Sequence, residues 1–237
     1  MNFRHILGAL ALIASATTAH AQVSVSASTV DLTALNEHSY YPPNFSLLSD
    51  QNGVAKFSLN SYGAASWWET NYGQTGDYVQ EYFTIGLHAG HRLTGFSITG
   101  QFNGQTYVYS DNNDGSATNS LGVYASITAE PYGQSYVNIN RTINNLNGQQ
   151  NMYLGASGLD LTGNKVLQLN AAITVIAVPT TVCNDGGCRQ ENSFSSIRLN
   201  NPVLTLNTQP VPEPETYAMM GIGLLLLGVV ARRRKQV

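Results

Sequence analysis

The segment Lys165-Val-Leu-Gln-Leu-Asn-Ala-Ala-Ile-Thr-Val-Ile-Ala-Val178 has the strand pattern from which the fold class is predicted. Every second residue from Leu167 to Ala177 is apolar, whereas Gln168 and Asn170 lie at intervening positions. Successive side chains of a strand point to opposite faces, so the apolar residues share one face. We therefore predict a strand that covers a hydrophobic core with one side and carries polar residues on the other.

Similar alternation recurs on both sides of this segment. Further strands are predicted at 23–27, 54–59, 78–85, 93–102, 105–109, 123–129, 135–139, 151–154 and 193–206. Between the two ends of the chain, no stretch has an apolar stripe with the 3.6-residue period of a helix, so helices should be absent or short. About ten strands joined by glycine- and asparagine-rich turns predict an all-β, antiparallel β-sandwich, of which the jelly roll is one form.

Two short motifs predict hairpins. Asn103-Gly104 separates two alternating segments, and both residues accept the positive φ of a type I′ turn. Cys183 and Cys188 enclose Asn-Asp-Gly-Gly, a turn-forming run between the last two long strands. In an oxidising compartment this spacing predicts a disulfide across the mouth of a hairpin. The alternatives are a metal pair, which lacks a nearby histidine, and a redox pair, which has two intervening residues instead of four.

The N-terminus has the pattern of a secretory signal peptide. Residues 1–21 combine Arg4, an apolar run from Ile6 to Ala14, and Ala19-His-Ala21 before Gln22. We expect the export translocon to carry the chain and signal peptidase to cleave between Ala21 and Gln22. A permanent N-terminal membrane helix is the alternative, but the apolar run is too short and is followed by threonines and a histidine.

Residues 209–237 predict a second targeting segment. The motif 211–216 precedes an uncharged apolar run at 217–231, which ends at Arg232, Arg233, Arg234 and Lys235. A helix of this length rises about 22 Å against a hydrocarbon core of about 30 Å, so we predict a short transmembrane helix whose basic side chains reach the membrane surface. The basic stop should stay cytoplasmic, which places the body beyond the inner membrane.

The residues Pro212, Glu213, Pro214 and Thr216, followed by a short apolar helix and a terminal basic cluster, resemble the PEP-CTERM sorting signal of Gram-negative exported proteins. The resemblance implies that an exosortase recognises and removes the tail. It further implies a transiently anchored body in the periplasm, then at the cell surface or in an extracellular matrix that contains exopolysaccharide. The alternative is a proline-stiffened linker before a permanent single-pass anchor.

The body between these segments is expected to be residues 22–208, which is long enough for one domain with a hydrophobic core. Arg4 and the four cations at 232–235 make up five of the 11 basic residues, whereas Glu213 and Glu215 are two of the 14 acidic ones. The body is therefore mildly acidic, and we expect it to bind neither nucleic acid nor anionic lipid.

No catalytic residue, metal site or cofactor is predicted. His88-Ala-Gly-His91 predicts a surface turn, because glycine and the flanking strands disfavour a helix on which both histidines could share a metal. Asp111-Asn-Asn-Asp114 resembles the start of a calcium loop, but Gly122 occupies the position of the bidentate glutamate. The segment 155–158 lacks the spacing of a nucleophile elbow. A glycosidase pair could be drawn from Glu69, Asp77, Glu81 and Glu130, but the sequence does not define their separation.

Trp67 and Trp68 suggest a binding surface. Adjacent residues on a strand face opposite sides, so at most one of the two joins the core, and the other covers a surface. An exposed indole could stack on a sugar ring while neighbouring Asn and Gln side chains bind its hydroxyls. The alternative is ordinary packing of aromatic side chains.

These observations favour a non-enzymatic exported protein with a structural or adhesive role in an exopolysaccharide or biofilm matrix. The main alternative is an extracellular carbohydrate-binding or carbohydrate-active protein. A third hypothesis is a ligand sensor at the inner membrane, which requires the tail to persist.

Overall fold

The computed structural model describes residues 23–35, 42–109, 115–211 and 222. The predicted signal peptide, Gln22, the sorting residues 212–216 and the basic stop lie outside the described residues, as does the helix predicted at 217–231 apart from Ile222. None of the helices formed by the described residues is both long and apolar enough to cross a membrane.

The described chain is built almost entirely of antiparallel strands, as predicted. In chain order its elements are β1 (Ser24–Ser26), β2 (Val30–Ala34), β3 (Phe45–Gln51), β4 (Val54–Leu59), α1 (Asn60–Ala65), β5 (Trp67–Thr70), β6 (Gly73–Leu87), β7 (His91–Tyr107), β8 (Ser116–Thr128), β9 (Ser135–Asn144), β10 (Gly148–Leu161), β11 (Lys165–Val178), β12 (Thr180–Asn184), β13 (Gly187–Glu191) and β14 (Phe194–Pro210).

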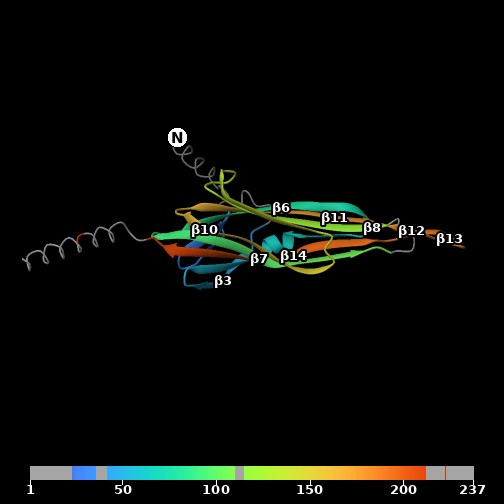
Figure 1. Ribbon diagram of the computed structural model, residues 1–237, viewed down its shortest axis with the longest axis horizontal. Helices are drawn as coiled ribbons and strands as arrows, with labels where there is room; N and C mark the ends of the chain where they lie inside the picture. The colour runs from blue at the N-terminus through green and yellow to red at the C-terminus, as the bar shows by residue number, and fades with distance from the viewer. Residues whose placement is uncertain (1–22, 36–41, 110–114, 212–221, 223–237) are drawn as a thin grey trace, which may run out of the picture.

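Eight of these strands are paired as in a jelly roll. Strand β4 pairs with β14, β6 with β11, β7 with β10, and β8 with β9. Of the eight strands in chain order, the first therefore pairs with the last, the second with the seventh, the third with the sixth and the fourth with the fifth. One layer, the β6 sheet, has the order β1-β2-β6-β11-β8-β9; the other, the β7 sheet, has the order β10-β7-β14-β4-β3, with β5 added beside β14. Figure 1 shows the two layers lying one above the other, with their strands running roughly along the long axis of the molecule. The prediction of an antiparallel sandwich is confirmed.

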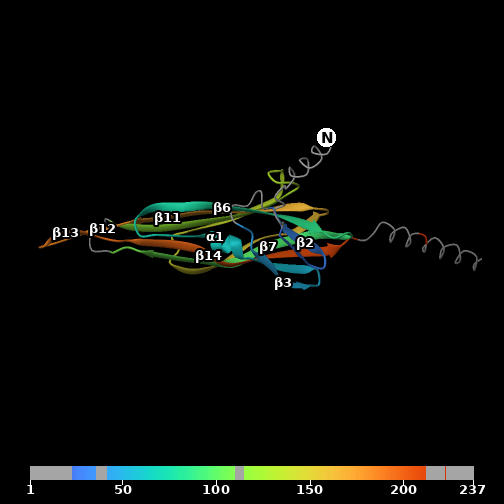
Figure 2. The same cartoon turned by 180° about the vertical axis from the view of Figure 1, so that it is seen from behind.

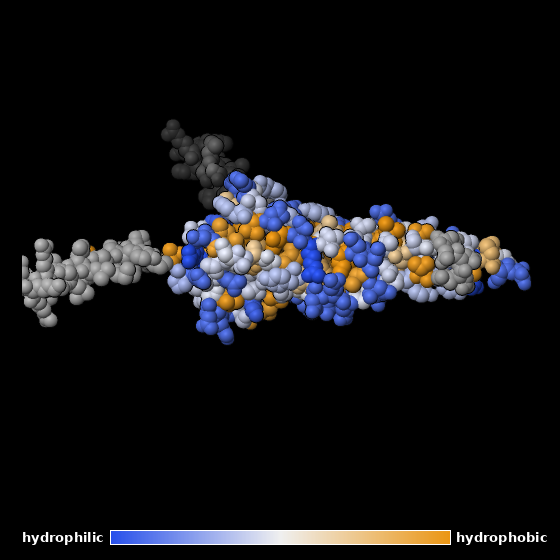
Figure 3. All heavy atoms as spheres, in the orientation of Figure 1, coloured by the Kyte–Doolittle hydropathy of each residue, from blue (hydrophilic) through white to orange (hydrophobic). Residues whose placement is uncertain are grey.

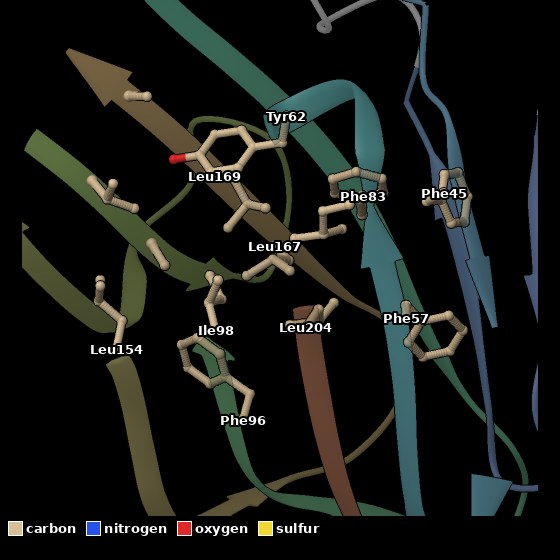
Figure 4. Close-up of a cluster of buried hydrophobic side chains, with 14 of the residues drawn as sticks. Phe45, Phe57, Tyr62, Phe83, Phe96, Ile98, Leu154, Leu167, Leu169 and Leu204 are labelled. Atoms are coloured by element: carbon tan, nitrogen blue, oxygen red, sulfur yellow. The ribbon is translucent and has the colours of Figure 1, made fainter. Parts of the chain in front are cut away.

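The core lies between the two sheets. In β11 the alternating residues from Leu167 to Ala177 are at most 3% exposed, as their pattern predicted. Figure 4 shows Phe83, Leu167 and Leu169 of the β6 sheet facing Ile98 and Leu204 of the β7 sheet. Each such side chain contributes about 1.5–3 kcal/mol through removal of apolar surface from water, so the period-two pattern fixes which face of each strand turns inward.

The prediction of a hairpin turn at Asn103-Gly104 is wrong. Both residues lie inside β7, a central strand, where Asn103 pairs with Gln149 of β10 on one side and with Arg198 of β14 on the other. Gly104 has no positive φ. A Cβ at this glycine would stand 2.5 Å from the carbonyl oxygen of Leu146, so glycine is needed here for close approach of two backbones and not for a turn.

We expect Gly104→Ala to lower the free energy of unfolding by about 1–3 kcal/mol, because the added methyl group would meet a backbone atom that cannot rotate away. The matched control is Gly86→Ala in β6, where the nearest atom to a new Cβ is 3.6 Å away and ordinary contact results. Urea denaturation of both variants measures the difference. Equal stability of the two variants would contradict the close approach.

Helix α1 interrupts the strand that runs beside β14. Strand β4 pairs with Val203–Asn207 and β5 with Ser195–Arg198, and α1 folds between the two sheets at the break (Figure 2). Tyr62 anchors the helix: its side chain is fully buried and its hydroxyl donates to the carbonyl oxygen of Asn170 at 2.6 Å. The chain leaves α1 directly into β5, so this anchor sets the position of the two tryptophans.

The predicted disulfide is present between Cys183 and Cys188, which are directly opposite each other in the two-stranded β12–β13 hairpin. This hairpin lies at one tip of the molecule, and β14 runs from it to the opposite end of the sandwich (Figure 1). Hydrophilic residues cover the hairpin tip (Figure 3). Strand β14 therefore ends, at Pro210, far from the disulfide.

Candidate functional site

Strand β5 separates the two tryptophans. Trp67 lies opposite Arg198 and Trp68 opposite Ile197 of β14, so the side chains alternate between the outer and the inner face of the β7 sheet. Trp68 packs against the core beside fully buried Ile197. Trp67 is 48% exposed. Trp67 is therefore the more exposed of the two indoles, whereas Trp68 is partly buried and has one side packed against the core.

A polar cleft of about 410 Å³ lies on the outer face of the β7 sheet beside Trp67. Strand pairing builds one row of side chains across four strands, from Trp67 through Arg198 and Asn103 to Gln149. A second row begins with Glu69 and continues through its cross-strand partners. The cleft is lined by Trp67, Glu69, Asn103, Gly104, Gln105, Asn147, Gly148, Gln149, Phe194, Ser196 and Arg198.

The side chain of Asn119 fixes the wall of this cleft that belongs to the β9–β10 turn. It accepts from the backbone nitrogen of Leu146 at 2.7 Å and donates to the carbonyl oxygens of Leu146 at 2.8 Å and Ser196 at 2.9 Å. Asn119 is buried and comes from β8 of the opposite sheet. One amide therefore ties the turn that carries Asn147 to strand β14, which carries Arg198.

The polar groups of the cleft have unused hydrogen-bonding capacity. Among the described residues, neither Glu69 nor Arg198 forms an ion pair. In the same part of the chain, the buried Oδ1 atom of Asn103 has no hydrogen-bond partner. A ligand in the cleft would therefore meet an acid, a guanidinium and several amides without first breaking bonds within the protein.

A wider and more apolar groove of about 870 Å³ lies on the other side of Trp67, between β5 and α1. Trp67 and Glu69 line both this groove and the polar cleft, so the indole stands on the ridge between them. The groove is lined by Pro42, Pro43, Asn44, Asn60, Ser61, Ala64, Ala65, Trp67, Trp68 and Glu69. An aromatic ridge with amides on one side and apolar surface on the other suits a ligand that has both hydroxyl edges and apolar faces.

Of the four acidic residues considered for a glycosidase pair, one lines the two cavities beside Trp67. In the described part of the chain, Glu69 lines the two cavities, whereas Asp77, Glu81 and Glu130 line neither. Hydrolysis of a glycosidic bond by the usual mechanisms needs two carboxyl groups about 5–10 Å apart. Among the described residues, Glu69 is therefore the one carboxylate that lines these two cavities.

Glu81 is instead buried in the core beneath α1. Among the described residues, neither of its carboxyl oxygens has a hydrogen-bond partner. Loss of hydration raises the pKa of Glu81 from 4.5 to about 7, and the nearby Ser61 hydroxyl acts in the opposite direction. The protonated form is therefore the one that the fold accommodates.

The motif His88–His91 lies at the junction of β6 and β7. His88 and His91 flank a turn, as predicted; His88 contacts Asp31 at 3.2 Å through Nε2 and the carbonyl oxygen of Ser28 at 3.0 Å through Nδ1. The hydrogen bond to Asp31 raises the pKa of His88. The described residues contain no cluster of three His, Cys, Asp or Glu side chains that could hold a metal. The calcium-like segment Asp111–Asp114 lies outside the described residues.

The comparisons with known proteins identify one local match. The model of the PEP-CTERM protein-sorting motif matches residues 210–235. Among curated proteins, no sequence matches the chain. Several solved structures are weakly similar in shape, of which three are described. The enzymatically active domain of bacteriophage CBA120 tailspike protein 4 has 10% identity and a TM-score of 0.29 over 62% of this chain, which spans 20% of that domain.

The other two are carbohydrate-binding modules. TmCBM61, solved with β-1,4-galactotriose, has 9% identity and a TM-score of 0.26, with 72% of this chain and 92% of that chain covered. A CBM4 structure has 12% identity and a TM-score of 0.24, with 72% and 81% covered. With TM-scores this low, none of the three likenesses assigns a function.

Proposed function

We propose that this chain, which carries the PEP-CTERM protein-sorting motif of exported proteins at residues 210–235, is a non-enzymatic matrix protein. It would bind exopolysaccharide through Trp67 and the adjoining cleft. The signal peptide would be residues 1–21, the glycan-binding body residues 22–208 and the sorting segment residues 209–237. Exosortase would release the body from its transient anchor in the inner membrane to the cell surface or the matrix.

The observation that carries this proposal is the exposed indole of Trp67 on the ridge between a polar cleft and an apolar groove. A pyranose ring has an apolar face of C–H groups and an edge of hydroxyls. The face can stack on the indole while Asn103, Gln149 and Arg198 bind the edge. A site open on both sides can accept a unit within a long chain, which a closed pocket for a single sugar cannot.

Retention of the exported chain on immobilised exopolysaccharide from the producing cells tests the proposal. We expect Trp67→Ala to weaken retention about five- to thirtyfold, the equivalent of about 1–2 kcal/mol for one lost stacking contact. The matched control is Tyr153→Ala in β10, an aromatic residue that is 61% exposed and lines neither cavity. Circular dichroism and thermal unfolding confirm that both variants fold. Equal retention of Trp67→Ala and the wild type would overturn the proposal.

A further inference from the structure

We propose that the opposite face of the sandwich carries a second glycan-binding site, a trough between Tyr78 and Tyr124 that accepts a neutral polysaccharide chain. The ligand class rests on the proposed function, but the site lies on the other sheet and shares no residue with the cleft at Trp67. Two sites on opposite faces would allow one molecule to cross-link two polysaccharide chains.

Strand pairing explains the shape of the trough. Across the outer face of the β6 sheet, Tyr78 lies opposite Ala172, which lies opposite Gly122, which in turn lies opposite Thr142. The two small residues in the middle of this row leave a floor, and the larger side chains around them form the walls. The cavity has a volume of about 430 Å³ and opens to solvent beside Tyr78, which is 52% exposed.

The neighbouring row supplies polar groups. Asn170 lies opposite Tyr124, and Tyr124 lies opposite Asn140. The Nε2 atom of Gln168 donates to the Oδ1 atom of Asn170 at 3.4 Å, which orients both amides within the sheet surface. The trough therefore joins two tyrosine rings, on which sugar faces can stack, to amide groups that can bind sugar hydroxyls.

The uncharged lining of the trough favours a neutral ligand. The outward positions of the four strands β6, β11, β8 and β9 that surround the trough carry uncharged side chains in the described structure. They include Tyr78, Gln80, Tyr82, Thr84, Gln168, Asn170, Ala172, Thr174, Ser120, Gly122, Tyr124, Ser126, Asn138, Asn140 and Thr142. Among the described residues that line the trough, an anionic polymer would find no cation to offset the loss of its hydration. Arg198 and Glu69 make the Trp67 cleft different in this respect.

A long glycan fits this surface better than a protein partner. A stable protein interface buries about 800 Å² on each partner around an apolar centre. Tyrosines separated by amides and hydroxyls provide no such centre, whereas they match the alternating polar and apolar surfaces of a sugar chain. The volume of the trough lies within the range of small-ligand sites, which is about 300–1,000 Å³.

Affinity electrophoresis of the exported chain in gels that contain the exopolysaccharide tests the second site, together with precipitation of the polysaccharide in solution. The variants are Trp67→Ala, Tyr78→Ala with Tyr124→Ala, and Ala172→Gln, which fills the trough from an exposed position without removing a core contact. We expect each variant to migrate more slowly in a gel with polysaccharide than in a gel without it, because one site remains. Each variant should nevertheless lose the ability to precipitate the polysaccharide, because cross-linking needs both sites. Trp67→Ala combined with Ala172→Gln should lose retardation as well.

The outcomes separate the two proposals. Loss of all retardation in Trp67→Ala would overturn the second site and leave the proposed function standing. Retardation that persists in Trp67→Ala but vanishes in Ala172→Gln would place binding in the trough and overturn the role of Trp67. No retardation of the wild type would overturn both. Self-association that occurs without polysaccharide and disappears in Ala172→Gln would show that the trough binds a second copy of the chain, which also overturns the second site.

Discussion

Glu81→Gln should stabilise the body by about 3 kcal/mol at pH 8 and leave its stability at pH 4 nearly unchanged. Burial raises the pKa of Glu81 from 4.5 to about 7, which corresponds to this free energy at 1.36 kcal/mol for each tenfold change in proton affinity. Below pH 4.5 the carboxyl group is protonated in both the folded and the unfolded chain. Between pH 4.5 and 7 the unfolded chain releases the proton while the folded chain keeps it.

The sign of this effect follows from proton binding. Because the folded state binds more protons in this window, the stability of the wild type should fall as the pH rises from about 4.5 to about 7 and then level off. Glutamine has nearly the same shape and cannot ionise, so the variant should lose this slope. The control is Glu130→Gln, which changes an exposed glutamate. Urea denaturation from pH 4 to 8 measures all three proteins, and a slope that survives in Glu81→Gln would refute the assignment.

Removal of residues 212–237 should move the exported chain from the membrane and the matrix to the soluble periplasmic fraction. The truncated chain lacks both the apolar segment 217–231 and the four cations proposed to stop translocation, so it would lack the proposed membrane anchor. Fractionation of cells followed by immunoblotting measures the change. We expect a nearly complete shift, because the free energy of transfer of a 15-residue apolar segment from water into a membrane is far larger than thermal energy.

A second variant distinguishes anchoring from sorting. Replacement of Pro212, Glu213 and Pro214 by alanine keeps the apolar segment and the basic stop, so the chain should accumulate uncut in the inner membrane. Mass spectrometry of the C-terminus should show that the wild type loses its tail near the motif. Arrival of the truncated chain in the matrix at the wild-type level would contradict the role of this segment.

Local sequence patterns were sufficient to predict a strand that packs one face against the hydrophobic core. The alternation in Lys165–Val178 predicted β11 with both its ends and its buried face, because burial acts on each residue of a strand independently of its partners. The same rule predicted that one tryptophan would leave the core, and the structure shows that this residue is Trp67. The six residues of α1 contain Gly63 and lack an apolar stripe, so no local signal marked the helix.

Features that depend on pairing between distant strands could not be predicted. Asn103-Gly104 has the local chemistry of a turn, but β10 and β14 pair with both edges of β7 and hold these residues extended. For the same reason Asn103, Gln149 and Arg198 gave no signal of a common site, since the jelly-roll order alone brings them into one row with Trp67. Their polar character was visible in the sequence, but their proximity was not.

The most direct test of glycan binding at Trp67 uses the fact that the chain contains two tryptophans. Their indole N–H groups give two separate signals in a ¹H–¹⁵N NMR spectrum, which Trp67→Phe assigns. During titration of the exported chain with oligosaccharides cut from the exopolysaccharide, we predict that the Trp67 signal shifts with saturation and shifts further than the signal of the partly buried Trp68. Saturable binding that leaves the Trp67 signal unmoved would contradict the site.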